Sequence, residues 1–118
     1  MTGVLVIAHG SRAKETETAL EDILSMVRAK MPDTVIECAF MEFSDRTIEK
    51  GVAALADKGV KKVKIVPYFL FMGVHMREDI PSMAAECAAK FPDIEIETGG
   101  PLGTDERLAD ILVDRIKA

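Results

Sequence analysis

The strongest constraint on the fold is a fourfold alternation of apolar runs with amphipathic stretches along the 118 residues. The first run, VLVIA at 4–8, is continuously apolar, as in a strand covered on both faces. Further strands are predicted over 35–41, 60–68 and 94–98. Strands separated by helices of this length predict right-handed βαβ crossovers and a parallel sheet. We therefore expect a three-layer α/β sandwich with a four-stranded parallel sheet in the order 2-1-3-4.

The helices follow from the spacing of apolar residues and from their end signals. We expect a helix over 14–31, where apolar residues recur as one stripe and Pro32 ends the pattern. A second helix is expected over 46–58, with Ser44 or Asp45 as its cap. A third is expected to begin near Asp79 with Pro81 in its first turn. The last is expected over 105–117 with four apolar residues on one face, namely Leu108, Ile111, Leu112 and Ile116.

Length and composition narrow the class of protein. A chain of 118 residues predicts one domain, 1–118. A formal net charge of −5, only 5% aromatic residues and no Trp argue against a nucleic-acid partner. The sequence has no export signal and no apolar stretch long enough for a membrane, which predicts a cytoplasmic protein without a membrane partner. Cys38 and Cys87 are expected to be buried, reduced thiols.

Both histidines of the chain fall where a parallel sheet binds its ligands. Ligands bind beyond the carboxyl ends of the strands, where the strand order reverses. His9 directly follows the first strand, and His75 lies in the loop after the third. In the order 2-1-3-4 these strands are neighbours, so the two imidazoles are expected to share one crevice. Two histidines with open coordination positions suit a transiently held divalent transition metal rather than a closed zinc site.

Other groups are expected around the same crevice. Glu42 is the first residue after the second predicted strand, where a carboxylate could hold the metal, accept a proton or only face solvent. The turn at 10–12 offers free backbone N–H groups to an anion. Four basic residues are expected on this rim and would supply local positive charge: Arg12, Lys14, Arg46 and Arg77.

The segment 69–76 is unusually apolar for a loop and surrounds Gly73. Three interpretations remain open at this point. The segment covers a flat hydrophobic ring, it contacts a second subunit, or it lies under the last helix.

Four segments together resemble a known family, and they extend over nearly the whole chain. They are VLVIAHGSR at 4–12, AFMEFSD at 39–45, VKIVPYFLFMGVHMREDIP at 63–81 and GPLGTDERL at 100–108. In this order they resemble the small form of the class II chelatases, the sirohydrochlorin cobaltochelatases of the anaerobic cobalamin pathway. Relatives in that family insert Ni²⁺ or Fe²⁺. The resemblance implies a chelatase-like, flavodoxin-like fold and a lyase activity.

The resemblance also implies roles for individual residues. His9 corresponds to a metal ligand that accepts protons from the pyrrole nitrogens, and His75 corresponds to the second metal ligand. Asp45 corresponds to a substrate-contacting position. The loop that lies against the macrocycle corresponds to Leu70, Phe71, Met72, Gly73 and Val74. The family implies no tightly bound cofactor, with Co²⁺, Ni²⁺ or Fe²⁺ as substrate metal, and a homodimer in the short form, because longer relatives carry two such halves.

Two positions depart from the family pattern, and two alternative functions remain. Arg46 stands where many relatives have Pro, and Met72 stands where some nickel-inserting relatives have an extra His. A non-catalytic protein that binds metal or tetrapyrrole would carry the same residues. A histidine-type phosphatase is less compatible with the sequence, because Ala8 stands where its Arg-His-Gly motif requires Arg.

Overall fold

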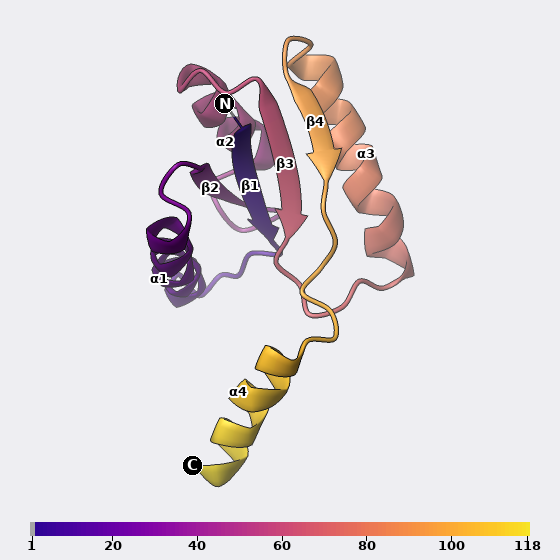
Figure 1. The fold of residues 1–118 in the computed structure, drawn as a ribbon. Coiled ribbons are helices and arrows are strands. Elements are labelled where there is room, and N and C mark those ends of the chain that lie inside the picture. Colours follow the sequence, from indigo (N-terminus) through magenta and orange to yellow (C-terminus); the bar gives the residue numbers. More distant parts are fainter. Residues whose placement is uncertain (1) are drawn as a thin grey trace.

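The computed structural model describes residues 2–118 as a parallel sheet with helices on both faces (Figure 1). The chain alternates strictly between strand and helix, as the sequence predicts. The elements are β1 (Thr2–Ala8), α1 (Glu15–Lys30), β2 (Val35–Phe40), α2 (Ile48–Asp57), β3 (Lys62–Pro67), α3 (Val74–Lys90), β4 (Glu95–Thr98) and α4 (Glu106–Lys117).

The sheet has the order β2-β1-β3-β4 with every pair parallel, which confirms the predicted fold class. Strand β1 is central. Its residue Leu5 lies opposite Glu37 of β2 on one side and opposite Ile65 of β3 on the other. All four strands end at the same edge of the sheet, so the loops that follow them form one rim.

One face of the sheet, here called the closed face, is covered by α2 and α3. Its core contains Leu5, Ile7, Val52, Leu55, Val63, Ile65 and Ile80, each at most 3% exposed. Helix α2 approaches the sheet closely at Gly51. A methyl group there would come within 2.5 Å of the Leu5 side chain. The missing side chain of Gly51 therefore sets the spacing between this helix and the central strand.

The opposite face, here called the open face, is only half covered. Helix α1 packs on β2, and its buried residues Leu20 and Leu24 join Val6, Ile36 and Phe40 in a smaller core. Figure 1 shows no helix over β3 or β4 on this side. Helix α4 instead projects away from the body of the molecule, and none of its residues is buried. The radius of gyration, 14.8 Å, is larger than the roughly 13.5 Å expected for a compact chain of this length.

Two predicted helix starts were wrong. Helix α3 begins at Val74, five residues before Asp79, because Gly73 adopts the extended conformation of an N-cap and Pro81 lies inside the helix rather than in its first turn. Helix α2 begins at Ile48, because the Thr47 side chain accepts a hydrogen bond from the Lys50 amide. Ser44 and Asp45 therefore do not cap it. The remaining ends differ from the predictions by one or two residues.

Two further expectations concern the cysteines and membranes. Cys38 and Cys87 are both free and buried, which confirms the predicted thiols. Among residues 2–118, no helix combines the length and the apolar character required to cross a lipid bilayer.

Candidate active site

His9 is the first residue after β1, and the turn that carries it is fixed by its neighbours. The Met41 amide donates to the Ala8 carbonyl oxygen (2.9 Å), and the Glu42 amide donates to the His9 carbonyl oxygen (3.0 Å). Gly10 has a φ of +92°, and a methyl group on it would come within 2.0 Å of the Glu42 carbonyl oxygen. Only glycine suits this conformation and this close approach. The backbone at His9 is therefore held between β1 and the loop after β2.

The imidazole of His9 is exposed and stacks on the ring of Phe69. The two ring centroids are 4.4 Å apart with an interplanar angle of 28°. Phe69 itself is only 7% exposed and belongs to the closed-face core. This positioning role of Phe69 was not predicted, because in the sequence the residue is distinguished only as part of an apolar loop. The core thus orients the histidine through an aromatic ring.

His75 is the second residue of α3, and not part of a loop as predicted. Its side chain is exposed. Because β1 and β3 are neighbours, His9 and the segment that leads to His75 start from adjacent strand ends on one rim. Phe69 lies in that segment and touches His9, so the loop after β3 connects the two histidine-bearing parts of the chain. The first turn of α3 also presents unpaired backbone N–H groups, which favour anions.

The loop before His75 presents apolar side chains to solvent. Leu70 is 53% exposed and Phe71 is 71% exposed, while Met72 is half-buried against the closed-face core. Val74 is also exposed. The interpretation that this segment lies under the last helix is therefore wrong for these residues. Leu70 and Phe71 instead line a shallow apolar groove of about 540 Å³ together with residues of α4.

Two carboxylates predicted near the site lie on the rim with exposed side chains. Asp45 is exposed in the loop after β2, and Glu42 is exposed beside the His9 turn. In the described part of the chain, no group of three or more His, Cys, Asp or Glu side chains lies close enough together to hold a metal ion. Glu42 therefore does not form a three-ligand centre with the two histidines.

The predicted basic rim is only partly available to a ligand. Arg46 is not free, because its guanidinium lies 2.7 Å from a carboxylate oxygen of Glu21. Lys14 pairs with Glu17 at 3.2 Å. Arg12, in contrast, lies with its guanidinium carbon 5.0 Å from the centroid of the Phe43 ring. Arg12 thus remains exposed beside His9, and the expectation that Arg46 belongs to a ligand-binding rim is corrected.

The Glu21 cluster is a structural feature that the sequence did not reveal. Glu21 accepts hydrogen bonds from Arg28, Arg46 and the Cys38 thiol. Burial alone would raise the pKa of Glu21, but these hydrogen bonds lower it to about 2. Burial, with the hydrogen bond to Glu21, raises the pKa of Cys38 to about 12. This cluster joins α1, β2 and the loop before α2, and it leaves Cys38 an unreactive thiol.

Comparison with known proteins places these features in a family. The CbiX family model matches residues 3–118. The chain is 35% identical over 115 residues to the chloroplastic sirohydrochlorin ferrochelatase of Arabidopsis thaliana, covering 98% of this chain and 51% of that protein. It is 34% identical over 122 residues to the sirohydrochlorin cobaltochelatase of Methanosarcina acetivorans, covering 98% of this chain and 94% of that protein.

A solved structure gives the same result. The sirohydrochlorin chelatase SirB from Bacillus subtilis subspecies spizizenii, in complex with cobalt, superposes with a TM-score of 0.88 at 32% identity, over 98% of this chain and 50% of that one. The chain thus spans about half the length of SirB and of the plant ferrochelatase. Family match, sequence identity and fold agree, and the chain belongs to the CbiX family.

Proposed function

We propose that this protein is a sirohydrochlorin chelatase that inserts a divalent metal ion into the tetrapyrrole, and that Co²⁺ is its preferred metal. One observation carries the proposal. An exposed histidine at the end of the central strand is oriented by a buried aromatic ring, on the same rim as the second histidine of the chain. This is the arrangement that a metal ligand requires if its ring must stay in place while the metal leaves it.

In this proposal His9 has two roles, one after the other. The neutral imidazole first binds the metal. As the ion passes to the ring, His9 is released from it and accepts one of the two pyrrole N–H protons that insertion displaces, and solvent takes the other. His75 is the second metal ligand. Two protein ligands leave the remaining coordination positions to solvent or substrate, so the ion is exchanged readily.

The tetrapyrrole is recognised by apolar and charged groups of the same rim. The exposed side chains of Leu70, Phe71 and Val74 provide an apolar surface for the flat macrocycle, with Met72 and Gly73 completing that loop. Asp45 contacts the substrate from the loop after β2. Sirohydrochlorin carries eight carboxylates, and the exposed guanidinium of Arg12 and the backbone N–H groups at 10–12 suit that charge.

The lengths of the relatives favour cobalt over iron. The chain covers 94% of the Methanosarcina acetivorans cobaltochelatase, but only 51% and 44% of the Arabidopsis thaliana and Priestia megaterium ferrochelatases. The short architecture therefore accompanies the cobalt-inserting relatives. We propose a homodimer as the active form, which would place two copies of the domain where longer relatives have two halves.

Replacing His9 tests the proposed chemistry. Multiple-turnover metallation of sirohydrochlorin with Co²⁺ under anaerobic conditions, followed by absorbance, should fall at least about 100-fold in His9→Ala. The fold should survive, because the His9 side chain is exposed. Near-normal turnover in His9→Ala would remove this residue from the mechanism.

The same assay separates the alternatives. Parallel reactions with Co²⁺, Ni²⁺ and Fe²⁺ rank the metals, and we expect Co²⁺ to be inserted fastest. Glu86→Gln, at an exposed position in the second half of α3, is a matched control that should leave the rate unchanged. A wild-type protein that binds metal and sirohydrochlorin but gives no more than one product per site would be a carrier and not an enzyme.

A further inference from the structure

Phe43, in the loop between β2 and α2, has an unusual backbone conformation for an aromatic residue. Its φ is +59°, and within residues 2–118 it is the one residue other than glycine with a positive φ. In this left-handed region the Cβ atom of an L-residue crowds the following carbonyl oxygen. Phe43 is 47% exposed, so burial offsets little of this strain. Strain that core packing does not explain points to a function of the side chain.

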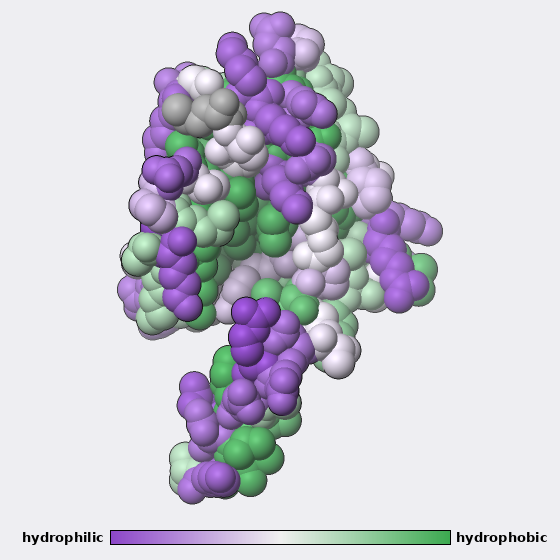
Figure 2. Space-filling view, in the orientation of Figure 1, coloured by the Kyte–Doolittle hydropathy of each residue, from purple (hydrophilic) through white to green (hydrophobic). Residues whose placement is uncertain are grey.

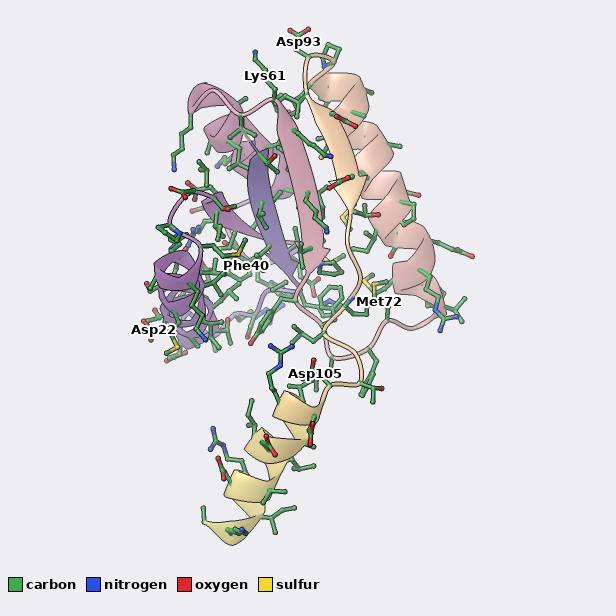
Figure 3. The ribbon with its side chains drawn as sticks, in the orientation of Figure 1. Asp22, Phe40, Lys61, Met72, Asp93 and Asp105 are labelled. Carbon is green, nitrogen blue, oxygen red and sulfur yellow. The ribbon has the colours of Figure 1, made fainter. Side chains whose placement is uncertain are left out.

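Contacts from the chain around His9 fix the conformation of Phe43. The amide of the preceding residue, Glu42, donates to the His9 carbonyl oxygen (3.0 Å). The carbonyl oxygen of Phe43 itself accepts a hydrogen bond from the Lys14 ammonium group (3.4 Å). Figure 3 shows Phe40, the last residue of β2, between α1 and the end of β1, so the loop that follows it starts beside the His9 turn. The strained residue is therefore held next to the proposed metal ligand.

The ring of Phe43 lies against the side chain of Arg12. The guanidinium carbon is 5.0 Å from the centroid of the ring, which is a cation–π distance. In the part of the chain that the structure describes, Arg12 belongs to no ion pair, whereas Lys14 and Arg46 each pair with a carboxylate of α1. A cation–π contact supports the guanidinium without neutralising its charge. Arg12 therefore keeps a full positive charge for a ligand.

The position of Arg12 suits the edge of a tetrapyrrole bound over His9. The loop 70–74 is the proposed surface for the flat macrocycle, and Figure 2 shows hydrophobic side chains where the body of the molecule meets α4. In the strand order β2-β1-β3, that loop and the loop that carries Phe43 lie on opposite sides of His9. A macrocycle that covers the loop 70–74 and His9 would therefore extend its other edge, with its carboxylates, toward Arg12.

We propose that Arg12 and Phe43 form a subsite for one peripheral carboxylate of the tetrapyrrole. The planar guanidinium of Arg12 binds the carboxylate through two parallel N–H···O hydrogen bonds, and it offsets the negative charge of Glu42 and Asp45, which are exposed in the same loop. Phe43 is a positioning residue, because its ring holds the guanidinium in place before the substrate binds and so reduces the freedom lost on binding. The inference rests on the proposed function, which supplies the ligand.

Steady-state metallation of sirohydrochlorin at saturating Co²⁺ separates binding from chemistry. The KM for sirohydrochlorin should rise about tenfold in Arg12→Gln and about threefold in Phe43→Gly. The kcat of both variants should stay within about twofold of the wild type, because His9 is unchanged. Lys30→Gln removes a positive charge at the far end of α1 and is the matched control, which should leave KM and kcat unchanged.

A double variant tests whether Phe43 acts through Arg12. Adding Phe43→Gly to Arg12→Gln should raise KM no further than Arg12→Gln alone, and Phe43→Tyr, which keeps an aromatic ring, should retain the KM of the wild type. Effects that multiply in the double variant would mean that Phe43 contacts the substrate by itself, and would overturn the positioning role. Variants with unchanged KM beside an active wild type would sink the subsite alone, whereas an inactive wild type would sink the proposed function.

Two measurements without metal or substrate test the geometry of the pair. Phe43→Gly should melt at a higher temperature than Phe43→Ala, because both lack the ring and only glycine adopts a positive φ freely. Both variants should shift the NMR signal of the Arg12 Nε–H group, which loses the neighbouring ring. Equal melting temperatures would contradict the strained conformation, and an unchanged Arg12 signal would show that the ring does not hold the guanidinium.

Discussion

The two faces of the sheet differ in how completely one chain covers them. On the closed face, α2 and α3 bury a continuous core in which Leu5, Ile7 and Leu55 are fully inaccessible to solvent. On the open face, α1 covers one half, and apolar side chains remain exposed beside it. The closed face therefore supplies most of the stability of the isolated chain. The open face and its rim keep apolar side chains exposed to solvent.

The largest difference between the faces should appear when a buried leucine is truncated. Leu55→Ala on the closed face removes a side chain with no exposed surface and should lower the free energy of unfolding by about 3 kcal/mol. Ile23→Ala on the open face, where the side chain is 39% exposed, should cost less than about 1 kcal/mol. Urea denaturation under identical conditions measures both. Similar losses would mean that the two faces contribute equally.

A medium effect is expected from the ionic cluster on the open face. Glu21→Gln removes the acceptor for Arg28 and Arg46, and it should lower the free energy of unfolding by about 1 kcal/mol at neutral pH. The Glu21 side chain is 33% exposed, so solvent screens part of the interaction.

The pH dependence of this effect has a defined sign. The pKa of Glu21 is lowered from 4.5 to about 2, so its stabilisation is complete above the higher value and is lost as the pH falls toward the lower one. The difference between wild type and Glu21→Gln should therefore shrink across that acidic range. Denaturation series at several pH values measure it, and a difference that stays constant down to the lower limit would exclude this role for Glu21.

The smallest effect is expected from an exposed ion pair on the closed side. Lys90 of α3 and Glu49 of α2 are 3.3 Å apart, but both side chains are more than half exposed. Lys90→Ala should change the free energy of unfolding by less than about 0.5 kcal/mol, with little further change in high salt. A larger loss in a thermal melt would show that this link between α2 and α3 contributes more to the closed face than its exposure indicates.

The order of the elements and the sheet could be predicted from the sequence, because they depend on local patterns. Continuous apolar runs identified the strands, and the helices between them required parallel pairing. The stripe at 108–116 was recognised, but periodicity alone cannot tell whether a stripe is covered by its own chain. The start of α3 was missed because Pro81 was taken as a first-turn residue, whereas the extended conformation of Gly73 starts the helix earlier.

The sequence predicted where the residues of the candidate site lie on the sheet, but not which side chains contact one another there. His9 and His75 could be assigned to one rim because strand ends of a parallel sheet share an edge. The stack of His9 on Phe69 depends on the path of a loop. The ion pair of Arg46 with Glu21 joins residues that are 25 positions apart in the sequence. Neither contact leaves a periodic signal. The ligand roles of His9, His75 and Asp45, and of the loop 70–74, stay predictions that the proposed assays address.

Phe69 makes two contacts. Its ring stacks on the imidazole of His9, and its carbonyl oxygen accepts a hydrogen bond from the Leu102 amide in the segment before the C-terminal helix. A displacement of that helix would therefore move Phe69, and Phe69 would in turn move the imidazole of His9. Any event that pulls on the tail of the chain should be detectable as a change in the chemical shifts of the His9 ring.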